Sequence, residues 1–237
     1  MTRTNEYGQP IGPALPNWSL PPVPPRSPLV GRYCTLEPLS TSHAPALHTA
    51  YLPTPESWTY LAYGPFPDLD SFTAWVAKQA ASADPQFFAV LDGTTPIGVV
   101  SYLRITPSAG FMEVGHLHYT AAMKRSPAAT ESMFLMMRQA FDLGYRRYEW
   151  KCDSLNAPSR AAARRLGFSF EGVFHNATVY KTRSRDTAWY SITDADWPAI
   201  RAAIEAWLAP DNFDAAGGQK VRLSDMTAPL RKPAQQD

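Results

Sequence analysis

The feature that most constrains the fold is the segment Glu149–Phe168, in which a strand is followed by a short helix with clear start and stop signals. Asn156 can cap this helix by accepting a hydrogen bond from a backbone N–H, and Pro158 suits the first turn, where N–H groups are unpaired. Gly167 suits the position just past the helix, where φ is positive. Because the N-terminus of a helix favours anions, the segment predicts a nucleotide-cofactor site at a strand-to-helix turn.

Length and charge limit the class of protein. The chain has 237 residues, of which 45% are hydrophobic. This predicts one domain of about 150–180 residues with extensions. The formal net charge of +1 argues against a nucleic-acid partner, because nucleic-acid binders usually carry a marked basic excess.

The two cysteines and the N-terminus bear on the cellular compartment. Cys34 and Cys152 lie in strand-like contexts and fit neither a disulfide framework nor a metal cluster. We expect two buried thiols in a reducing environment and no metal. No apolar run is long enough to span a membrane, and residues 1–6 lack the apolar region of a secretion signal. We therefore expect a cytoplasmic protein with no membrane partner.

Both ends of the chain differ in composition from its middle. Residues 1–30 contain eight of the 23 prolines and predict an extended arm, with a ligand for a proline-reading domain as the alternative. The tail, residues 209–237, has few large apolar groups and predicts a mobile or loosely docked segment. The catalytic domain is then expected over residues 31–208. Apolar residues that predict partial docking of the arm are Trp18, Leu20 and Val23.

Between the ends, helical and strand periods alternate. The expected strands are Tyr33–Leu36, Phe87–Leu91, Ile97–Ile105, Met112–Tyr119, Arg146–Cys152, Glu171–Phe174 and Thr187–Ile192. The expected helices are Thr41–Leu52, Asp70–Ala83, one from Ser126 to Gly144, one from Asn156, and one ending at Leu208. Turns after Leu91 and Ile105 predict three antiparallel strands, and the following strand–helix–strand unit predicts a parallel pair.

The pattern Asn156-x-x-Ser159 followed by Leu166-Gly167-Phe168 resembles the last core motif of the GCN5-related N-acetyltransferases. The element order over residues 28–208 is similar to the fold of that family, in particular its ribosomal-protein N-acetyltransferase-like branch. The resemblance implies an α/β (α+β layered) acyl-coenzyme A N-acyltransferase fold. Such a fold has a mixed, mostly antiparallel central sheet with helices on both faces. Its fourth and fifth strands, here Met112–Tyr119 and Arg146–Cys152, would splay apart to admit a pantetheine arm.

The same resemblance implies an activity. The expected reaction moves the acetyl group of acetyl-coenzyme A (acetyl-CoA) to a primary amine by direct transfer in a ternary complex. The acceptor would be a protein N-terminal α-amine or a small amine, and a homodimer is left open. The alternative is a non-catalytic acyl-CoA-binding or scaffolding protein of the same fold.

Transfer to an amine needs a base and a stabiliser for the oxyanion. Glu113 enters a central strand, where burial would raise its pKa toward that of a base; an ion pair with Arg104 is the alternative. Gly115 predicts a bulge whose backbone N–H would polarise the thioester carbonyl, as the resemblance implies. By strand alternation, His116 and His118 are expected on the face opposite Glu113, with His116 as a second candidate catalyst and ordinary packing as the alternative for both.

The helix after Asn156 supplies further candidates. The resemblance implies that Asn156 contacts the pantetheine arm and that Ser159 is a candidate acid for the leaving thiolate. A reciprocal cap, in which both side chains satisfy helix amides, is the structural alternative. Arg164 and Arg165 lie further along the helix, where they could reach nucleotide phosphates.

The expected pyrophosphate loop, Lys124–Ala129, departs from the family pattern because Pro127 replaces a glycine. Proline cannot donate an N–H to phosphate, although it fits the first turn of a helix. The amides expected to remain free for phosphate are those of Ser126, Ala128, Ala129 and Thr130. The full set of predicted cofactor-binding residues is His118, Tyr119, Lys124, Arg125, Ser126, Ala128, Ala129, Thr130, Asn156 and Arg164. The alternative is an ordinary Ser-Pro helix start beside a solvated basic pair.

Overall fold

The computed structural model describes residues 3–233. Its strands are β1 (Arg3–Thr4), β2 (Pro10–Ile11), β3 (Leu29–Val30), β4 (Thr35–Pro38), β5 (Gln86–Asp92), β6 (Thr95–Thr106), β7 (Phe111–Tyr119), β8 (Arg147–Asp153), β9 (Ser169–Tyr180) and β10 (Arg183–Thr193). Its α-helices are α1 (Ala44–Tyr51), α2 (Leu69–Ala80), α3 (Pro127–Asp142), α4 (Ala157–Arg165), α5 (Trp197–Leu208) and α6 (Leu223–Thr227). Short 3₁₀ turns are η1 (Thr41–His43), η2 (Pro55–Trp58), η3 (Pro107–Ala109), η4 (Pro210–Asn212) and η5 (Ala228–Leu230).

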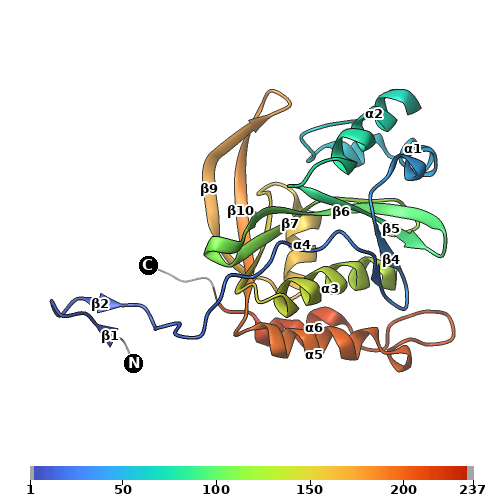
Figure 1. Cartoon of the computed structure of the whole chain (residues 1–237). Coiled ribbons are helices and arrows are strands. Elements are labelled where there is room, and N and C mark those ends of the chain that lie inside the picture. The colour runs from blue at the N-terminus through green and yellow to red at the C-terminus, as the bar shows by residue number, and fades with distance from the viewer. Residues whose placement is uncertain (1–2, 234–237) are drawn as a thin grey trace.

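One eight-stranded sheet has the order β3-β4-β5-β6-β7-β8-β10-β9. Its neighbouring strands are antiparallel except for β7 and β8, which are parallel. The expected mixed sheet with one parallel pair is therefore confirmed. The short hairpin β1–β2 stands away from the sheet (Figure 1).

Helices cover both faces of the sheet, as expected. Alternation along β5 sends Phe87 and Ala89 to one face, where they pack with residues of α1 and α2. Phe88 and Val90 point to the other face, which is covered by α3, α4, α5 and α6. Figure 1 shows α1 and α2 above the sheet and α3, α5 and α6 below it. We call the first of these the α1–α2 face and the second the α3–α4 face.

The N-terminal arm docks through prolines. Pro21 and Pro24 are buried, whereas Leu20 and Val23 are 65% and 58% exposed. The Tyr145 hydroxyl donates to the carbonyl of Pro22 (3.1 Å). Trp18 lies against Gly110, where an added Cβ would be 3.2 Å from Trp18 Cζ2, so the expected docking of Trp18 is confirmed. The prediction that Leu20 and Val23 would also dock is wrong.

The tail is packed against the domain, so the prediction of a loosely docked segment is also wrong. Leu223 of α6 is fully buried in the main core. The Thr227 hydroxyl lies 2.9 Å from the carbonyl of Arg165 at the end of α4. The tail escaped prediction because its few apolar residues are spread over single turns and show no helical period.

The last hairpin is much longer than expected. Strands β9 and β10 span 12 and 11 residues, against predicted segments of Glu171–Phe174 and Thr187–Ile192. Figure 1 shows this hairpin rising past the sheet toward the level of α1 and α2. Its polar outer half has no apolar alternation to reveal it in the sequence.

Candidate active site

The parallel strands β7 and β8 separate part-way along their length. Their pairing runs from Phe111↔Arg147 to Val114↔Trp150. Further along, β7 pairs with β6 and β8 pairs with β10. Within residues 3–233, the facing edges beyond Trp150 therefore carry no ladder partner, which leaves peptide groups able to bond to an inserted chain. The predicted splay is confirmed.

A β-bulge in β7 lies directly at this opening. Gly115 pairs with Ser101 and His118 with Val99, so two residues of β7 bulge opposite one residue of β6. The left-handed residue is His116, with φ of 52°. Gly115 has another reason to be glycine, because an added Cβ would lie 2.9 Å from Leu103 Cδ2. The predicted bulge is present, displaced by one residue.

The bulge changes the side-chain alternation of β7. Glu113, His116 and His118 all lie on the α1–α2 face, since the ring of His116 packs on Phe87 (5.0 Å between centroids) and that of His118 stacks on Tyr51 (3.8 Å). The expectation that the histidines oppose Glu113 is wrong. The extra residue in the strand resets the period of two on which that expectation depended.

Both histidines are neutral; His118 is buried and His116 is partly buried. Burial lowers the pKa of His116 to about 4, and its Nδ1 lies 3.0 Å from the Tyr63 hydroxyl. Burial also lowers the pKa of His118 to about 3, and its Nε2 lies 2.7 Å from Ser57 Oγ. The His118 ring fills the space between Tyr51 and Trp58, so its side chain anchors the segment after α1.

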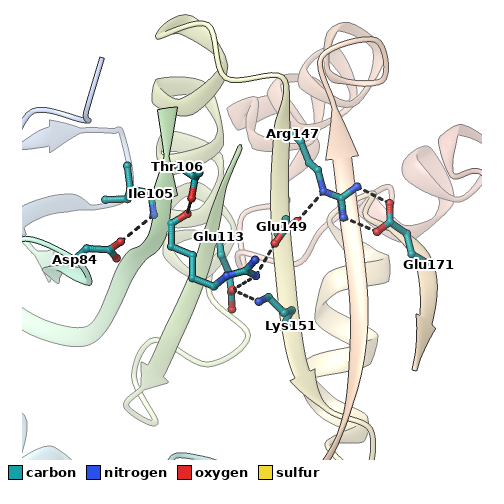
Figure 2. Close-up of polar contacts among 9 residues, drawn as sticks. Asp84, Ile105, Thr106, Glu113, Arg147, Glu149, Lys151 and Glu171 are labelled. Atoms are coloured by element: carbon teal, nitrogen blue, oxygen red, sulfur yellow. Dashed lines mark hydrogen bonds and ion pairs between the residues drawn. The ribbon is translucent and has the colours of Figure 1, made fainter. Parts of the chain in front are cut away.

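A chain of alternating charges crosses the α1–α2 face of the sheet (Figure 2). Its members, in spatial order, are Glu171, Arg147, Glu149, Arg104, Glu113 and Lys151. They come from the four strands β6, β7, β8 and β9, and adjacent members lie within 3.3 Å of each other. The chain balances buried carboxylates with cations, which keeps their desolvation tolerable.

Glu113 lies between Arg104 and Lys151 in this chain. Its Oε2 lies 3.3 Å from Arg104 and 2.7 Å from Lys151 Nζ. The ion pair with Arg104, considered as an alternative from the sequence, is present, and Lys151 is a second partner that the sequence did not suggest. Burial raises the pKa of Glu113 to about 8, although the charge of Arg104 opposes this rise. The carboxylate is thus buried, beside the splay, and in the range of a base that works near neutral pH.

Backbone amides of the loop before α3 donate to carbonyls of the same loop. The amide of Ser126 donates to the carbonyl of Met123 (3.2 Å), and the amide of Ala129 donates to that of Ser126 (3.2 Å). Two of the four amides expected to be free are therefore engaged. Lys124 and Arg125 are exposed, and Arg125 has φ of 63°.

The residues that follow in α3 are buried. Ala128 packs in the main core, and the Thr130 hydroxyl accepts from Arg165 Nη1 (2.8 Å). Arg164, the neighbour of Arg165, is exposed to solvent. Arg165 is therefore the arginine of α4 that reaches the first turns of α3. Tyr119, at the end of β7, is partly buried against the same core.

Asn156 and Ser159 differ in role. Asn156 Oδ1 accepts from the amide of Ser159 (3.1 Å), which confirms the predicted cap. The Ser159 hydroxyl accepts from Trp150 Nε1 (3.0 Å) and bonds to no helix amide, so the reciprocal cap is wrong. Burial raises the pKa of the nearby Cys152 thiol, and the neighbouring Ser159 hydroxyl partly offsets this rise.

The β9–β10 hairpin closes over the α1–α2 face at the splay. Lys181 Nζ donates to the carbonyl of Trp58 (2.8 Å) and Arg183 Nη2 to that of Thr59 (2.6 Å). Nearer the sheet, the Tyr180 hydroxyl donates to Asp153 Oδ2 at the end of β8 (2.7 Å). These contacts hold the hairpin against the segment after α1 and against the end of β8, beside the splayed strands. These contacts could not be predicted because the outer half of the hairpin lacks the apolar alternation of a strand.

Comparison with known proteins identifies the family. Residues 34–169 match the acetyltransferase (GNAT) domain. The crystal structure of a GCN5-related N-acetyltransferase from Brucella melitensis is 44% identical, with a TM-score of 0.88 over 90% of this chain and 100% of its own. The chain belongs to the GCN5-related N-acetyltransferase (GNAT) family. It is therefore an acetyl-CoA-dependent N-acetyltransferase.

Other GNAT structures are more distant. A GNAT-family acetyltransferase from Chromobacterium violaceum is 39% identical, with a TM-score of 0.77 over 81% of this chain and 98% of its own. A Salmonella typhimurium acetyltransferase that modifies the N-terminal serine of ribosomal protein L7/L12 is 21% identical, with a TM-score of 0.61 over 69% of this chain and 96% of its own. That likeness shows the shared fold alone. No curated protein sequence matches the chain.

The geometry fits acetyl-CoA as GNAT co-substrate. The unpaired strand edges at the splay offer peptide groups to a pantetheine arm, and Asn156 and Ser159 lie beside them at the start of α4. In residues 3–233 no helix has the length and apolar character to cross a membrane. The same residues contain no group of three His, Cys, Asp or Glu side chains that could hold a metal ion.

Proposed function

We propose that this GNAT enzyme transfers the acetyl group directly to a primary amine in a ternary complex, with Glu113 as base and Ser159 as acid. The observation that carries the proposal is the opening between β7 and β8. The buried carboxylate of Glu113 lies beside this opening on the α1–α2 face. Helix α4, which carries the Ser159 hydroxyl, lies beside it on the α3–α4 face. Amine and thioester can thus approach from opposite sides.

The residues divide the proton transfers between them. As the amine nitrogen bonds to the acetyl carbon and the carbon–sulfur bond breaks, the nitrogen gives up a proton and the sulfur gains one. Glu113, with its raised pKa, accepts the first, directly or through a water next to His116. Ser159 supplies the second, because the Trp150 N–H already occupies an acceptor position on its oxygen and leaves the hydroxyl hydrogen free. The amides of the bulge would stabilise the oxyanion.

Lys124, Arg125 and the amides at the start of α3 are proposed to hold the pyrophosphate. Pro127 lacks an N–H, but the exposed basic pair and the positive end of a 16-residue helix favour an anion there. The acceptor is proposed to be an α-amine of a peptide or protein, or a small amine. The protein-modifying Salmonella neighbour shares the fold that would accommodate either.

Two measurements test the proposal. Acetyl-CoA at a hundredfold excess over its dissociation constant should stabilise the protein by about 2–3 kcal/mol, seen as a raised melting temperature. Thiol release should then appear when amines of both classes are added. Cofactor binding without thiol release from any amine would support the non-catalytic alternative, and the absence of any cofactor-induced shift would refute the proposed site.

A further inference from the structure

Arg185 is a cation without an anionic partner on the α1–α2 face. It lies on β10, four residues before Trp189, which pairs with Lys151 across the ladder. Strand alternation therefore places the Arg185 side chain on the same face as Lys151 and Glu113. Its Nε is buried and has no hydrogen-bond acceptor within residues 3–233.

The other cations of this face are neutralised. Arg104, Arg147 and Lys151 each lie within 3.3 Å of a glutamate carboxylate. Arg185 forms no ion pair in the described part of the chain, and its guanidinium lies over the Tyr180 ring, 5.8 Å from the centroid. Its charge still reaches the reaction centre, because it lowers the pKa of Glu113 against the effect of burial.

Two more observations indicate that a ligand supplies hydrogen-bond acceptors at this place. Trp189 Nε1, on the same face of the same strand, is also buried without a partner. Buried N–H groups left unpaired in this way usually meet a ligand or water. The hairpin also carries Lys181 and Arg183, which bond to backbone carbonyls and to no carboxylate of the described residues. The hairpin side of the site therefore attracts anions.

We propose that Arg185 binds a carboxylate of the acceptor, so that the substrates are amines that also carry a carboxylate. This inference rests on the proposed function. The guanidinium presents parallel N–H donors that match the two oxygens of a carboxylate. A doubly charged phosphate fits less well, because Glu113 on the same face would repel it more strongly. The carboxylate could be the α-carboxylate of a free amino acid or an acidic side chain near the N-terminus of a peptide.

Paired acceptors that differ in one charge test this inference. Alanine against alaninamide probes the α-carboxylate, and the peptide Ser-Asp-Ala-Ala-amide against Ser-Asn-Ala-Ala-amide probes the side chain. Thiol release from acetyl-CoA gives KM for each acceptor with the wild type and the Arg185→Gln variant. Arg231→Gln is the matched control, because Arg231 Nε is also buried without a partner but lies in the tail.

For at least one pair, the wild type should show a KM about 10- to 100-fold lower for the carboxylate member. Arg185→Gln should remove this preference and leave KM for the amide member and for acetyl-CoA within about twofold. Arg231→Gln should behave as the wild type. Which pair responds identifies the source of the carboxylate.

Equal KM values within both pairs for the wild type, or a variant that raises KM for both members equally, would overturn the inference while leaving the proposed function intact. If acetyl-CoA binds but no acceptor is acetylated, the proposed function fails. In that case, the melting temperatures of the wild type and of Arg185→Gln, measured with and without the carboxylate ligands, test whether Arg185 binds a carboxylate. A stabilisation by the carboxylate ligands that is absent in Arg185→Gln would support it, and no stabilisation of the wild type would refute it.

Discussion

Glu131 offers the sharpest test of how the first turns of α3 are held. Its buried carboxylate accepts hydrogen bonds from the backbone amides of Arg32 (2.8 Å), Tyr33 (2.5 Å) and Cys34 (2.9 Å). Gly31 packs so closely on this carboxylate that an added Cβ would lie 2.3 Å from Oε2. One side chain therefore ties the turn between β3 and β4 to α3. We predict that Glu131→Gln destabilises the protein strongly.

The magnitude follows from counting donors and acceptors. A glutamine can direct its single oxygen at two of the three amides, and its NH₂ group then faces the third amide, which stays unpaired. Losing one charge-assisted hydrogen bond costs about 1.5–3 kcal/mol, and changing the other two from charged to neutral costs about 0.5–1 kcal/mol each. The expected loss of unfolding free energy is therefore about 2.5–5 kcal/mol.

Urea unfolding followed by tryptophan fluorescence measures this loss. Glu205→Gln is the control, because Glu205 pairs with Arg201 at the surface (2.9 Å, side chains 47% and 40% exposed) and should lose less than about 0.5 kcal/mol. A loss for Glu131→Gln no larger than that of the control would refute the reasoning. The three amides that Glu131 binds belong to residues 32–34 and not to the loop of Lys124, so KM for acetyl-CoA should stay within about twofold; a large rise would mean that Glu131 serves the cofactor instead.

Four further predictions address the site and the tail. Glu113→Gln should lower turnover with little change in acetyl-CoA affinity, and the rise of the wild-type rate with pH through the Glu113 pKa of about 8 should disappear in the variant. Asn156→Ala should weaken acetyl-CoA binding in calorimetry and cost about 0.5–2 kcal/mol of stability, whereas Ser159→Ala should slow single-turnover chemistry with little loss of affinity. Because the folded pKa of His118 is about 3 and the unfolded chain protonates first, the His118 contribution to the unfolding free energy should fall below pH 6.5 by about 1.4 kcal/mol per unit. His118→Gln should remove this contribution, so the variant should lose less stability than the wild type between pH 7.5 and 5 in urea unfolding. Truncation before α6 should lower stability by about 2–5 kcal/mol in the same assay, because it removes the fully buried Leu223 from the core.

The sequence predicted the features that depend on local periodicity. The strand–helix–strand unit around α3 was read from apolar spacing and a Ser-Pro start, and its parallel pair follows from the length of the crossover. The cap at Asn156 was likewise visible, because an asparagine before a Pro-containing first turn has few other structural roles. The splay came from family resemblance, since no local pattern states where two strands part.

Features that depend on contacts between distant segments escaped prediction. A bulge adds one residue to a strand without altering its composition, so the true face of His116 could be known only from the register against β6. Lys151 lies next to Cys152 in the sequence and gives no sign of its ion pair with Glu113, which comes from the neighbouring strand. Arg185 belongs to a polar strand segment that only its ladder with β9 reveals.

The charge chain and the bulge together explain why the strands part where they do. Parallel strands tend to continue pairing, and the last rung here is Val114↔Trp150. Up to that rung, the ion pairs of Glu149 and Glu113 connect β6, β7 and β8, and Lys151, one residue further, reaches back to Glu113. Immediately beyond it, the bulge at His116 turns β7 toward β6 and away from β8. The ion pairs therefore hold the closed half of the strand pair, and the bulge holds the other half open. Glu113, the proposed base, lies at the boundary between the two halves.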